Sequence, residues 1–564
     1  MNNIIQQDYF KELREQILDT NKWDKKHFII FNHEAGTGKS REARRILGEM
    51  TKTHDHRVLY VQLFERNQEL DNTVRSINEH AGRIVAERFA KDDIKSRKKR
   101  EQAIEAQILC ITHRMYKQIC SGTHRDLLEG RGILIIDEYP DLLEKITVSR
   151  DDIMHLWADY CDYRHKEIED LAYILRDKLN EYEKKYYAIQ HKKMIPLSFE
   201  SEKYDKYKKA IRQLLKMRMD KEKKELLRKF QQILENGALF FEKKFHTYDA
   251  SYDFVLLDNN IILDANANFD YRYRLSDKFI LKNQEKVHDY AHSVFYQYNV
   301  NTSKKGLSKY LNFMQTVLGE ISIEGRKGIL FVTDKDNKKN VEKSIEYYFA
   351  SYGDNLSEIE ERLNCKIAVD YFGNLVGVNT YKDFDTVVIL KTPFFDYLTY
   401  SLTYFYFQKK LPSENIEIFK DEEVENIRKN AVAGEIYQAI KRISRDNSHS
   451  AKMYVFCDNQ DIVDIVLQQF KNIQYVKREI YVTKKKEEQD NSKRKETLYE
   501  QKITELRELL LEYKEAGVPS VRKKELREKL GIKDKSNFAK ILRSQHSFLQ
   551  THYIVNKGQK LIFK

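Results

Sequence analysis

Residues 28–40, which read Phe-Ile-Ile-Phe-Asn-His-Glu-Ala-Gly-Thr-Gly-Lys-Ser, decide the fold of the first part of the chain. The apolar run predicts a buried strand, and the glycines predict a loop whose backbone N–H groups can approach phosphates closely. A helix would begin at Lys39 and Ser40, so that the lysine reaches the β- and γ-phosphates and the serine helps to hold Mg²⁺. His33 stands where the full P-loop pattern has glycine, and the alternative interpretation is an ordinary glycine turn. We predict binding of ATP and Mg²⁺ by a loop made of Gly36, Thr37, Gly38, Lys39 and Ser40.

Composition limits the class of protein. The 564 residues, of which 41% are hydrophobic, are enough for several domains with their own cores. The chain has no run of about 18 apolar residues and no signal peptide at its beginning, so we predict a cytoplasmic protein with no membrane partner. The five cysteines form no Cys-x-x-Cys pair, which argues against a zinc ribbon, an iron–sulfur cluster or a disulfide framework. The net charge of +12 favours an anionic partner such as nucleic acid.

The chain divides into segments of different pattern. Residues 1–145 alternate helical stretches with continuous apolar runs, which is typical of an α/β domain around a parallel sheet. Residues 146–250 have helical spacing and no strand signals, so we predict a helical insertion in this domain. Residues 251–299 would complete the first domain and connect it to a second α/β domain at 300–483. Candidate strands are residues 28–31, 58–63, 108–112, 132–136, 254–257, 261–263, 329–332, 366–369, 386–390 and 453–456.

A second motif, Gly-Ile-Leu-Ile-Ile-Asp-Glu-Tyr-Pro at residues 132–140, is an apolar run that ends in two carboxylates. Asp137 would lie in the Mg²⁺ shell, and Glu138 would orient and deprotonate the attacking water. On its own the pair could also be a solvated loop start, but the P-loop upstream favours the catalytic interpretation.

A third motif, Gln438-x-x-x-Arg442-x-x-Arg445, lies on a predicted helix. Arg442 and Arg445 are three residues apart and would share one helix face. Arginines that come from a second domain can stabilise charge on the γ-phosphate in the transition state. The alternative is a solvated basic helix face.

These three motifs, in this order, resemble those of the superfamily 2 helicases over about residues 25–465. The P-loop resembles motif I and Asp137-Glu138 resembles motif II. The third motif resembles motif VI, although Lys441 replaces its usual glycine. Weaker resemblances in the same order are residues 58–62 to motif Ia, 111–114 to a backbone-contacting motif, 263–267 to motif III, 329–334 to motif IV and 373–379 to motif V.

The resemblance implies two RecA-like domains that bind ATP in the cleft between them. Lys39, Ser40, Asp137 and Glu138 would come from the first domain, and Gln438, Arg442 and Arg445 from the second. One strand of DNA would lie in the motor cleft, where phosphate contacts carry no sequence information. Its phosphates would be held by Thr112, Thr333, Gly377 and Asn379.

The C-terminal part begins with a charged segment, residues 484–497, that we predict to be a linker. Residues 498–564 are basic and predict three helices and a two-stranded hairpin, an order that resembles a winged helix. Its third helix would enter the major groove of duplex DNA and its wing would approach phosphates. The contacting residues would be Lys535, Asn537, Lys540, Arg543 and Lys557. The alternative is a winged helix used for protein contact or as a structural cap.

The sequence therefore predicts an α/β chain of two RecA-like parallel-sheet domains, with a helical insertion in the first and a C-terminal winged helix. The predicted function is that of an ATP-dependent DNA helicase or translocase, and the composition hints at replication of a phage or mobile element. One alternative is an RNA helicase or ribonucleoprotein remodeller. Another is a non-translocating, ATP-switched DNA-binding or defence protein. The insertion could guide nucleic acid or form a structural or partner-binding arm, and both interpretations stay open.

Overall fold

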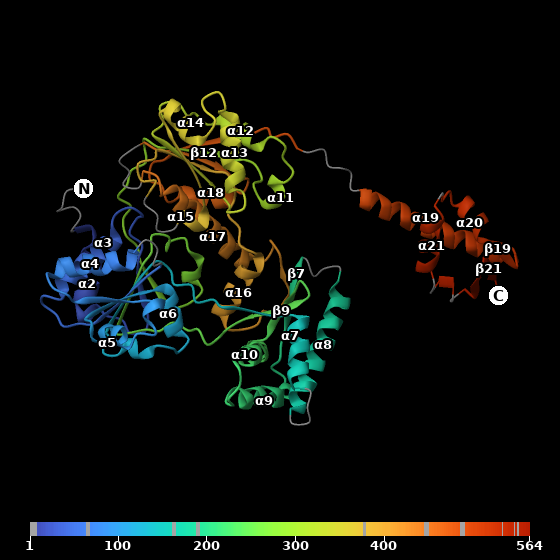
Figure 1. Cartoon of the computed structure of the whole chain (residues 1–564), viewed down its shortest axis with the longest axis horizontal. Coiled ribbons are helices and arrows are strands. Elements are labelled where there is room, and N and C mark those ends of the chain that lie inside the picture. Colours follow the sequence, from blue (N-terminus) through green and yellow to red (C-terminus); the bar gives the residue numbers. More distant parts are fainter. Residues whose placement is uncertain are drawn as a thin grey trace. The chain divides into compact units, whose positions relative to one another are not determined.

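The computed structural model describes residues 8–63, 68–160, 165–187, 192–375, 380–444, 450–484, 491–532, 534–545, 548–549 and 552–563 (Figure 1). The chain forms two compact units, one of Met1–Leu307 with Met314–Tyr481 and the other of Ser308–Phe313 with Val482–Lys564. In the part of the chain that the structure describes, no helix is long and apolar enough to cross a membrane.

The first domain is built on a seven-stranded sheet in which all paired strands are parallel. Alternate residues of each strand enter cores on opposite faces: Ile29 and Phe31 pack on one face, and Phe28 and Ile30 on the other. The strand order is β11 (Phe279–Lys282), β1 (Phe28–Phe31), β10 (Asn259–Leu263), β5 (Ile133–Asp137), β2 (Val58–Gln62), β4 (Ile108–Thr112) and β3 (Ala86–Phe89). The helices around this sheet are α2 (Lys11–Leu18), α3 (Lys39–Met50), α4 (Glu69–Ala81), α5 (Arg97–Glu105) and α6 (His113–Cys120).

One predicted strand of this domain, at residues 254–257, is wrong. The segment is irregular, although Phe254 is buried in the core. Side chains replace ladder partners here, because the Tyr116 hydroxyl donates to the carbonyl of Val255 (2.9 Å) and the Leu257 N–H donates to Oδ1 of Asn260 (2.6 Å). The other predicted strands of the domain are confirmed to within one residue or two at each end.

The second domain has a six-stranded parallel sheet. Its order is β14 (Lys366–Tyr371), β13 (Gly328–Thr333), β15 (Thr386–Ile389), β17 (Lys452–Phe456), β12 (Val294–Asn299) and β18 (Gln474–Glu479). The four strands predicted here are confirmed. The sheet also contains β12, which begins before the boundary at residue 300 that the sequence predicts. The accompanying helices are α11 (Lys304–Leu307), α12 (Phe313–Glu320), α13 (Lys338–Tyr348), α14 (Leu356–Leu363), α15 (Phe372–Leu375) and α18 (Gln460–Leu467).

The insertion combines helices with an antiparallel sheet, so the prediction that it lacks strands is wrong. Its helices are α7 (Arg150–Tyr160), α8 (Lys166–Tyr186), α9 (Asp205–Leu215) and α10 (Lys221–Asn236). Its sheet has the order β16 (Ile416–Glu417), β7 (Lys193–Leu197), β8 (Ala238–Phe241), β9 (Lys244–Tyr248) and β6 (Lys145–Val148). These strands are short, and the apolar run of β8 follows a helix directly, so periodicity alone does not separate the two.

Residues 397–440 leave the second domain and pack against both domains. Helix α16 (Tyr397–Gln408) packs into the core of the first domain. Helix α17 (Glu422–Ile440) packs into both cores, with Val424 and Ile427 in the first and Val432 and Ile436 in the second. This helix therefore runs from the first domain to the third motif.

The second unit contains α19 (Asn491–Glu515), β19 (Ser520–Arg522), α20 (Lys523–Lys529), α21 (Lys535–Ser544), β20 (Ile554–Lys557) and β21 (Lys560–Phe563). The strands form a three-stranded antiparallel sheet in the order β19-β21-β20. Helix α19 begins inside the predicted linker, because lysine, arginine and glutamate are good helix formers. The three helices and the hairpin occur in the predicted order, and the winged-helix assignment stays a prediction.

Candidate functional site

Strand register brings the first two motifs to one edge of the first sheet. Strands β1, β10 and β5 are neighbours, and Phe31, Leu263 and Asp137 lie at the same level across them. Because the strands are parallel, the residues that follow each strand emerge at the same edge. The P-loop, Asp264 and Glu138 therefore lie side by side.

The P-loop has a backbone suited to phosphate. Gly36 and Gly38 adopt positive φ angles of 92° and 90°, which side chains rarely tolerate. Gly38 is the N-cap of α3, so the unpaired N–H groups at the start of this helix lie beside Lys39 and Ser40. The Thr37 hydroxyl donates to the carbonyl of Glu34 (2.8 Å) and closes the loop. The five predicted loop residues are thus brought together.

His33, the departure from the P-loop pattern, is a packing residue. Its ring is fully buried and contacts Tyr9, Phe10 and Phe31, with ring centroids 4.9, 4.6 and 5.8 Å away. Its Nε2 atom lies 3.1 Å from the carbonyl oxygen of Tyr9. Burial, with a smaller contribution from the charge of Lys39, lowers the pKa of His33 to about 4. The His33 imidazole is therefore neutral, and it packs against aromatic side chains at the start of the loop.

Glu138, which follows β5, has an unusual backbone conformation and a carboxyl group whose pKa is shifted by burial. Glu138 has a positive φ of 70°, and its N–H donates to the carbonyl of Leu263 (3.0 Å). Burial, followed by the neighbouring charge of Asp137, raises the pKa of Glu138 to about 7, against the opposing effects of Lys39 and Arg442. A carboxylate with such a pKa is a suitable proton acceptor near neutral pH.

Asp264, which lies in the segment that resembles motif III, is a further carboxylate of this site and was not among the predicted site residues. It is 3% exposed, and it accepts hydrogen bonds from the Tyr273 hydroxyl (2.8 Å) and the Asn266 N–H (2.8 Å). Burial raises its pKa, and Lys39 opposes this effect. The sequence alone does not show that β10, which directly precedes Asp264, is the neighbour of β1 in the sheet, so it could not place Asp264 beside the P-loop.

The third motif is only partly helical, which corrects the prediction. Gln438 lies in the last turn of α17, but the helix ends at Ile440 and Arg442 follows it. The N–H of Arg442 bonds to the carbonyl of Ala439, three residues back (3.2 Å), which tightens the chain into a turn. Arg442 is 6% exposed, and it lies close enough to Glu138 for its charge to lower the pKa of that carboxyl group. Arg445 lies outside the described residues.

Of the four residues predicted to contact nucleic acid in the motor, the structure describes Thr112 and Thr333. The Thr112 hydroxyl caps α6 by accepting from the Met115 N–H (3.3 Å). Thr333, at the end of β13, is only 2% exposed. Gly377 and Asn379 lie outside the described residues. These contacts stay predictions.

In the second unit, α21 has one buried and one exposed face. Phe538, Ile541 and Leu542 are buried. The predicted contact residues Lys535, Asn537, Lys540 and Arg543 are all exposed on this helix, and Lys557 is exposed at the end of β20. The charges of the lysine and arginine side chains are therefore available to an anionic partner.

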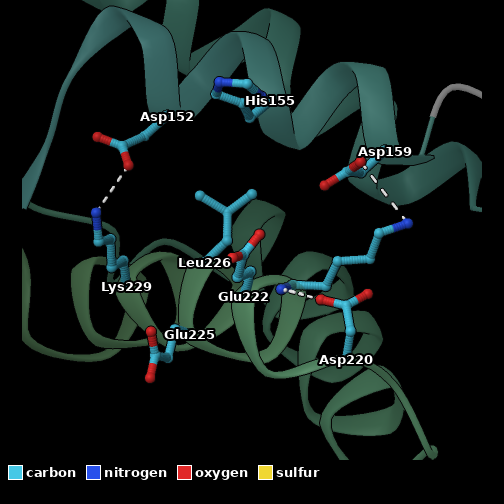
Figure 2. A pocket seen from close by; sticks show the side chains of 9 residues that line it. Asp152, His155, Asp159, Asp220, Glu222, Glu225, Leu226 and Lys229 are labelled. Carbon is cyan, nitrogen blue, oxygen red and sulfur yellow. Dashed lines mark hydrogen bonds and ion pairs between the residues drawn. The ribbon is translucent and has the colours of Figure 1, made fainter.

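A hollow of about 470 Å³ in the insertion contains none of the predicted site residues (Figure 2). It lies between α7 and α10, and two of its acidic side chains are paired with lysines: Asp152 with Lys229 (2.8 Å) and Asp159 with Lys223 (3.7 Å). Within the described ranges, no group of three or more His, Cys, Asp or Glu side chains could hold a metal ion.

The comparisons with known proteins support the fold. No protein-family model and no curated protein matches the chain. Among solved structures, Xpd4 of S. tokodaii has 13% sequence identity and a TM-score of 0.50, over 84% of this chain and 100% of that chain.

Two solved helicase structures match the chain with lower TM-scores. The DEAD-box helicase Mss116 bound to ssRNA and UDP-BeF has 10% identity and a TM-score of 0.40, over 97% of this chain and 89% of that one. The Mycobacterium smegmatis helicase Lhr bound to ssDNA and AMP-PNP has 10% identity and a TM-score of 0.35, over 100% of this chain and 60% of that one. The fold of the chain is thus α/β with two RecA-like domains, as the sequence predicts.

Proposed function

We propose that this chain is an ATP-dependent motor on nucleic acid, a helicase or translocase of the superfamily 2 type. The observation that carries the proposal is the arrangement of the motifs: the P-loop and Asp137-Glu138 share one sheet edge, and the buried Arg442 of the second domain lies within electrostatic reach of Glu138. An ATPase that couples hydrolysis to movement needs groups from both domains at one nucleotide, since their separation then follows hydrolysis.

Each group has a role in this proposal. The N–H groups of the loop and Lys39 bind the β- and γ-phosphates, while Glu138 orients the attacking water and accepts its proton. Arg442, with Gln438 four residues before it in the sequence, offsets the charge that develops on the γ-phosphate. Arg445 is proposed for the same role.

The residues present fit Mg²⁺ together with a nucleotide. Ser40 and Asp137 offer one hydroxyl and one carboxylate, and Mg²⁺ in such sites takes its remaining ligands from water and substrate phosphates. The ion, when bound, supplies a positive charge that offsets phosphate charge.

DNA is the proposed substrate, with the motor on one strand and the second unit on the duplex. The exposed basic face of α21 supports this, because lysine and arginine side chains on a helix can enter a major groove and neutralise phosphates. RNA is the alternative substrate. A role in replication of a phage or mobile element rests on composition alone.

The test is ATP hydrolysis measured without nucleic acid and with single-stranded DNA, duplex DNA or RNA. Lys39→Ala removes the phosphate-binding lysine, and Lys52→Ala, an exposed lysine of the same domain, is the matched control. Stimulation by DNA that is lost only in Lys39→Ala is the expected result. Stimulation mainly by RNA would replace DNA by RNA as the substrate, and no hydrolysis under any condition would contradict a motor.

A further inference from the structure

Glu34, within the P-loop, is tied to the segment that leads into the second domain. The side chain is 4% exposed. Its Oε2 atom accepts from the backbone N–H groups of Val287 (3.1 Å) and His288 (3.0 Å), and its Oε1 atom accepts from the Tyr290 hydroxyl (2.8 Å). The P-loop is thus hydrogen-bonded to the residues that directly precede β12.

Lys441 approaches the same hydroxyl from the third motif. It is 4% exposed, and its Nζ atom donates to the Tyr290 hydroxyl at 2.5 Å and lies 5.0 Å from the centre of the tyrosine ring. Lys441 is also the residue that replaces the usual glycine of motif VI, directly before Arg442. The hydroxyl accepts from the lysine and donates to the glutamate, so the three side chains form one directed chain of hydrogen bonds.

Two buried side chains of opposite formal charge, Glu34 and Lys441, are joined through the Tyr290 hydroxyl. Taking either group out of water is costly, so the hydrogen bonds that each makes inside the protein favour the observed arrangement. The tyrosine ring is itself fixed, because it packs edge-on against Phe470 with ring centroids 4.9 Å apart. The chain of hydrogen bonds therefore has one preferred geometry, which joins the P-loop to the turn that carries Arg442.

We propose that Lys441 is a positioning residue for ATP hydrolysis. Through Tyr290 and Glu34 it holds the turn with Arg442 against the P-loop before nucleotide arrives. This inference rests on the proposed function, since it concerns the same nucleotide site. It adds that hydrogen bonds within the protein itself help to hold the two domains together in the absence of nucleotide.

The kinetic test uses Lys441→Met and Tyr290→Phe, with Lys429→Met as matched control. Lys429 lies on α17 and forms a partly exposed ion pair with Asp461 (2.5 Å), so this variant also removes a paired lysine near the third motif. A misplaced catalytic group costs up to about 100-fold in rate. We expect kcat to fall about 10- to 100-fold in Lys441→Met and in Tyr290→Phe, with KM for ATP changed less than about threefold.

The double variant Lys441→Met/Tyr290→Phe distinguishes the network from two separate effects. If both side chains act through one chain of hydrogen bonds, the double variant should be no slower than the slower single variant. Additive losses, or a loss of the same size in Lys429→Met, would overturn the proposal. Thermal unfolding of each variant checks that the chain is folded at the assay temperature.

A distance measurement tests the same proposal without any hydrolysis. Spin labels at Ile84→Cys in the first domain and Tyr347→Cys in the second report domain separation, since both side chains are highly exposed. The Cys161→Ser background removes the cysteine that lies outside the described residues, and the other four are buried.

Without nucleotide, we expect one narrow distance distribution for the otherwise unchanged protein and a broader, longer one for Lys441→Met. An unchanged distribution in Lys441→Met would overturn the positioning role. This measurement needs no ATP. A chain that fails to hydrolyse ATP would therefore contradict the proposed function, while the two distance distributions could still be compared.

Discussion

The two sides of the proposed nucleotide site are built in different ways. On the first-domain side, each group follows a strand within a few residues, and the register of β1, β10 and β5 alone brings the groups together. On the second-domain side, Arg442 follows a helix that is packed into two cores, and Lys441 beside it is held by Tyr290 and Glu34 from distant parts of the chain.

This difference separates chemistry that local sequence encodes from chemistry that depends on tertiary packing. A strand followed by a short loop has few possible geometries, so its functional residues can be placed from the sequence. A residue beyond a helix end can point in several directions until packing selects one.

The largest expected effect concerns the first-domain side. Glu138→Gln removes the proposed proton acceptor but keeps the size and polarity of the side chain. We expect the rate of ATP hydrolysis to fall by about 10²–10⁴-fold, the usual contribution of general base catalysis, while ATP binding is retained. Single-turnover hydrolysis and equilibrium binding of a labelled nucleotide measure the two effects.

The control for this variant is Glu129→Gln, which changes an exposed glutamate of the same domain. Hydrolysis by Glu138→Gln at the rate of the control would show that the strand-end carboxylate is not the base.

A second prediction tests how firmly the first-domain side is packed. His33 is neutral in the folded protein down to about pH 4, whereas an unfolded histidine takes up a proton below about pH 6.5. The unfolded state then binds more protons, so stability falls as the pH drops through this window, by ~1.4 kcal/mol per pH unit and ~3 kcal/mol in all. His33→Phe should reduce this pH dependence.

The measurement is the midpoint of urea unfolding from pH 7.5 to pH 4.5, compared with the exposed control His155→Phe. Equal pH dependence of the unfolding midpoint in His33→Phe and in the control would contradict the buried, neutral histidine.

The smallest expected effect lies outside both sides of the site, in the second unit. Lys540→Ala/Arg543→Ala removes two exposed charges of α21. If both contact phosphates, the slope of log K against log[salt] for duplex DNA should become shallower by about 1.8, and affinity should fall by about tenfold. ATP hydrolysis without nucleic acid should not change.

The control is Lys524→Ala, an exposed lysine of α20 in the same unit. An unchanged salt slope in Lys540→Ala/Arg543→Ala would assign the basic face of α21 to another partner.

The difference between residues placed by local sequence and residues placed by tertiary packing also explains which features could be predicted from the sequence. Strands β1 and β4 were predicted at their observed bounds, because each is a continuous apolar run limited by polar residues. The glycines of the P-loop and the carboxylates after β5 are equally local signals.

Features that depend on distant partners were missed. The strands of the insertion pair with one another across long helices, and β16 joins them from more than 150 residues away in the chain. Residues 254–257 look like a strand but find side-chain partners. Asp264 and Glu34 acquire their importance only from neighbours in the fold, and the helix predicted through Arg442 ends two residues earlier because the chain tightens into a turn.

The most direct test of the central claim, that the second domain completes the nucleotide site, is single-turnover ATP hydrolysis by Arg442→Ala with Kd for ATP measured in parallel. Arg362→Ala, an exposed arginine of the same domain, is the control. We expect the rate to fall by about 10³-fold while Kd stays within about threefold. A rate equal to that of the control would contradict a site shared by the two domains.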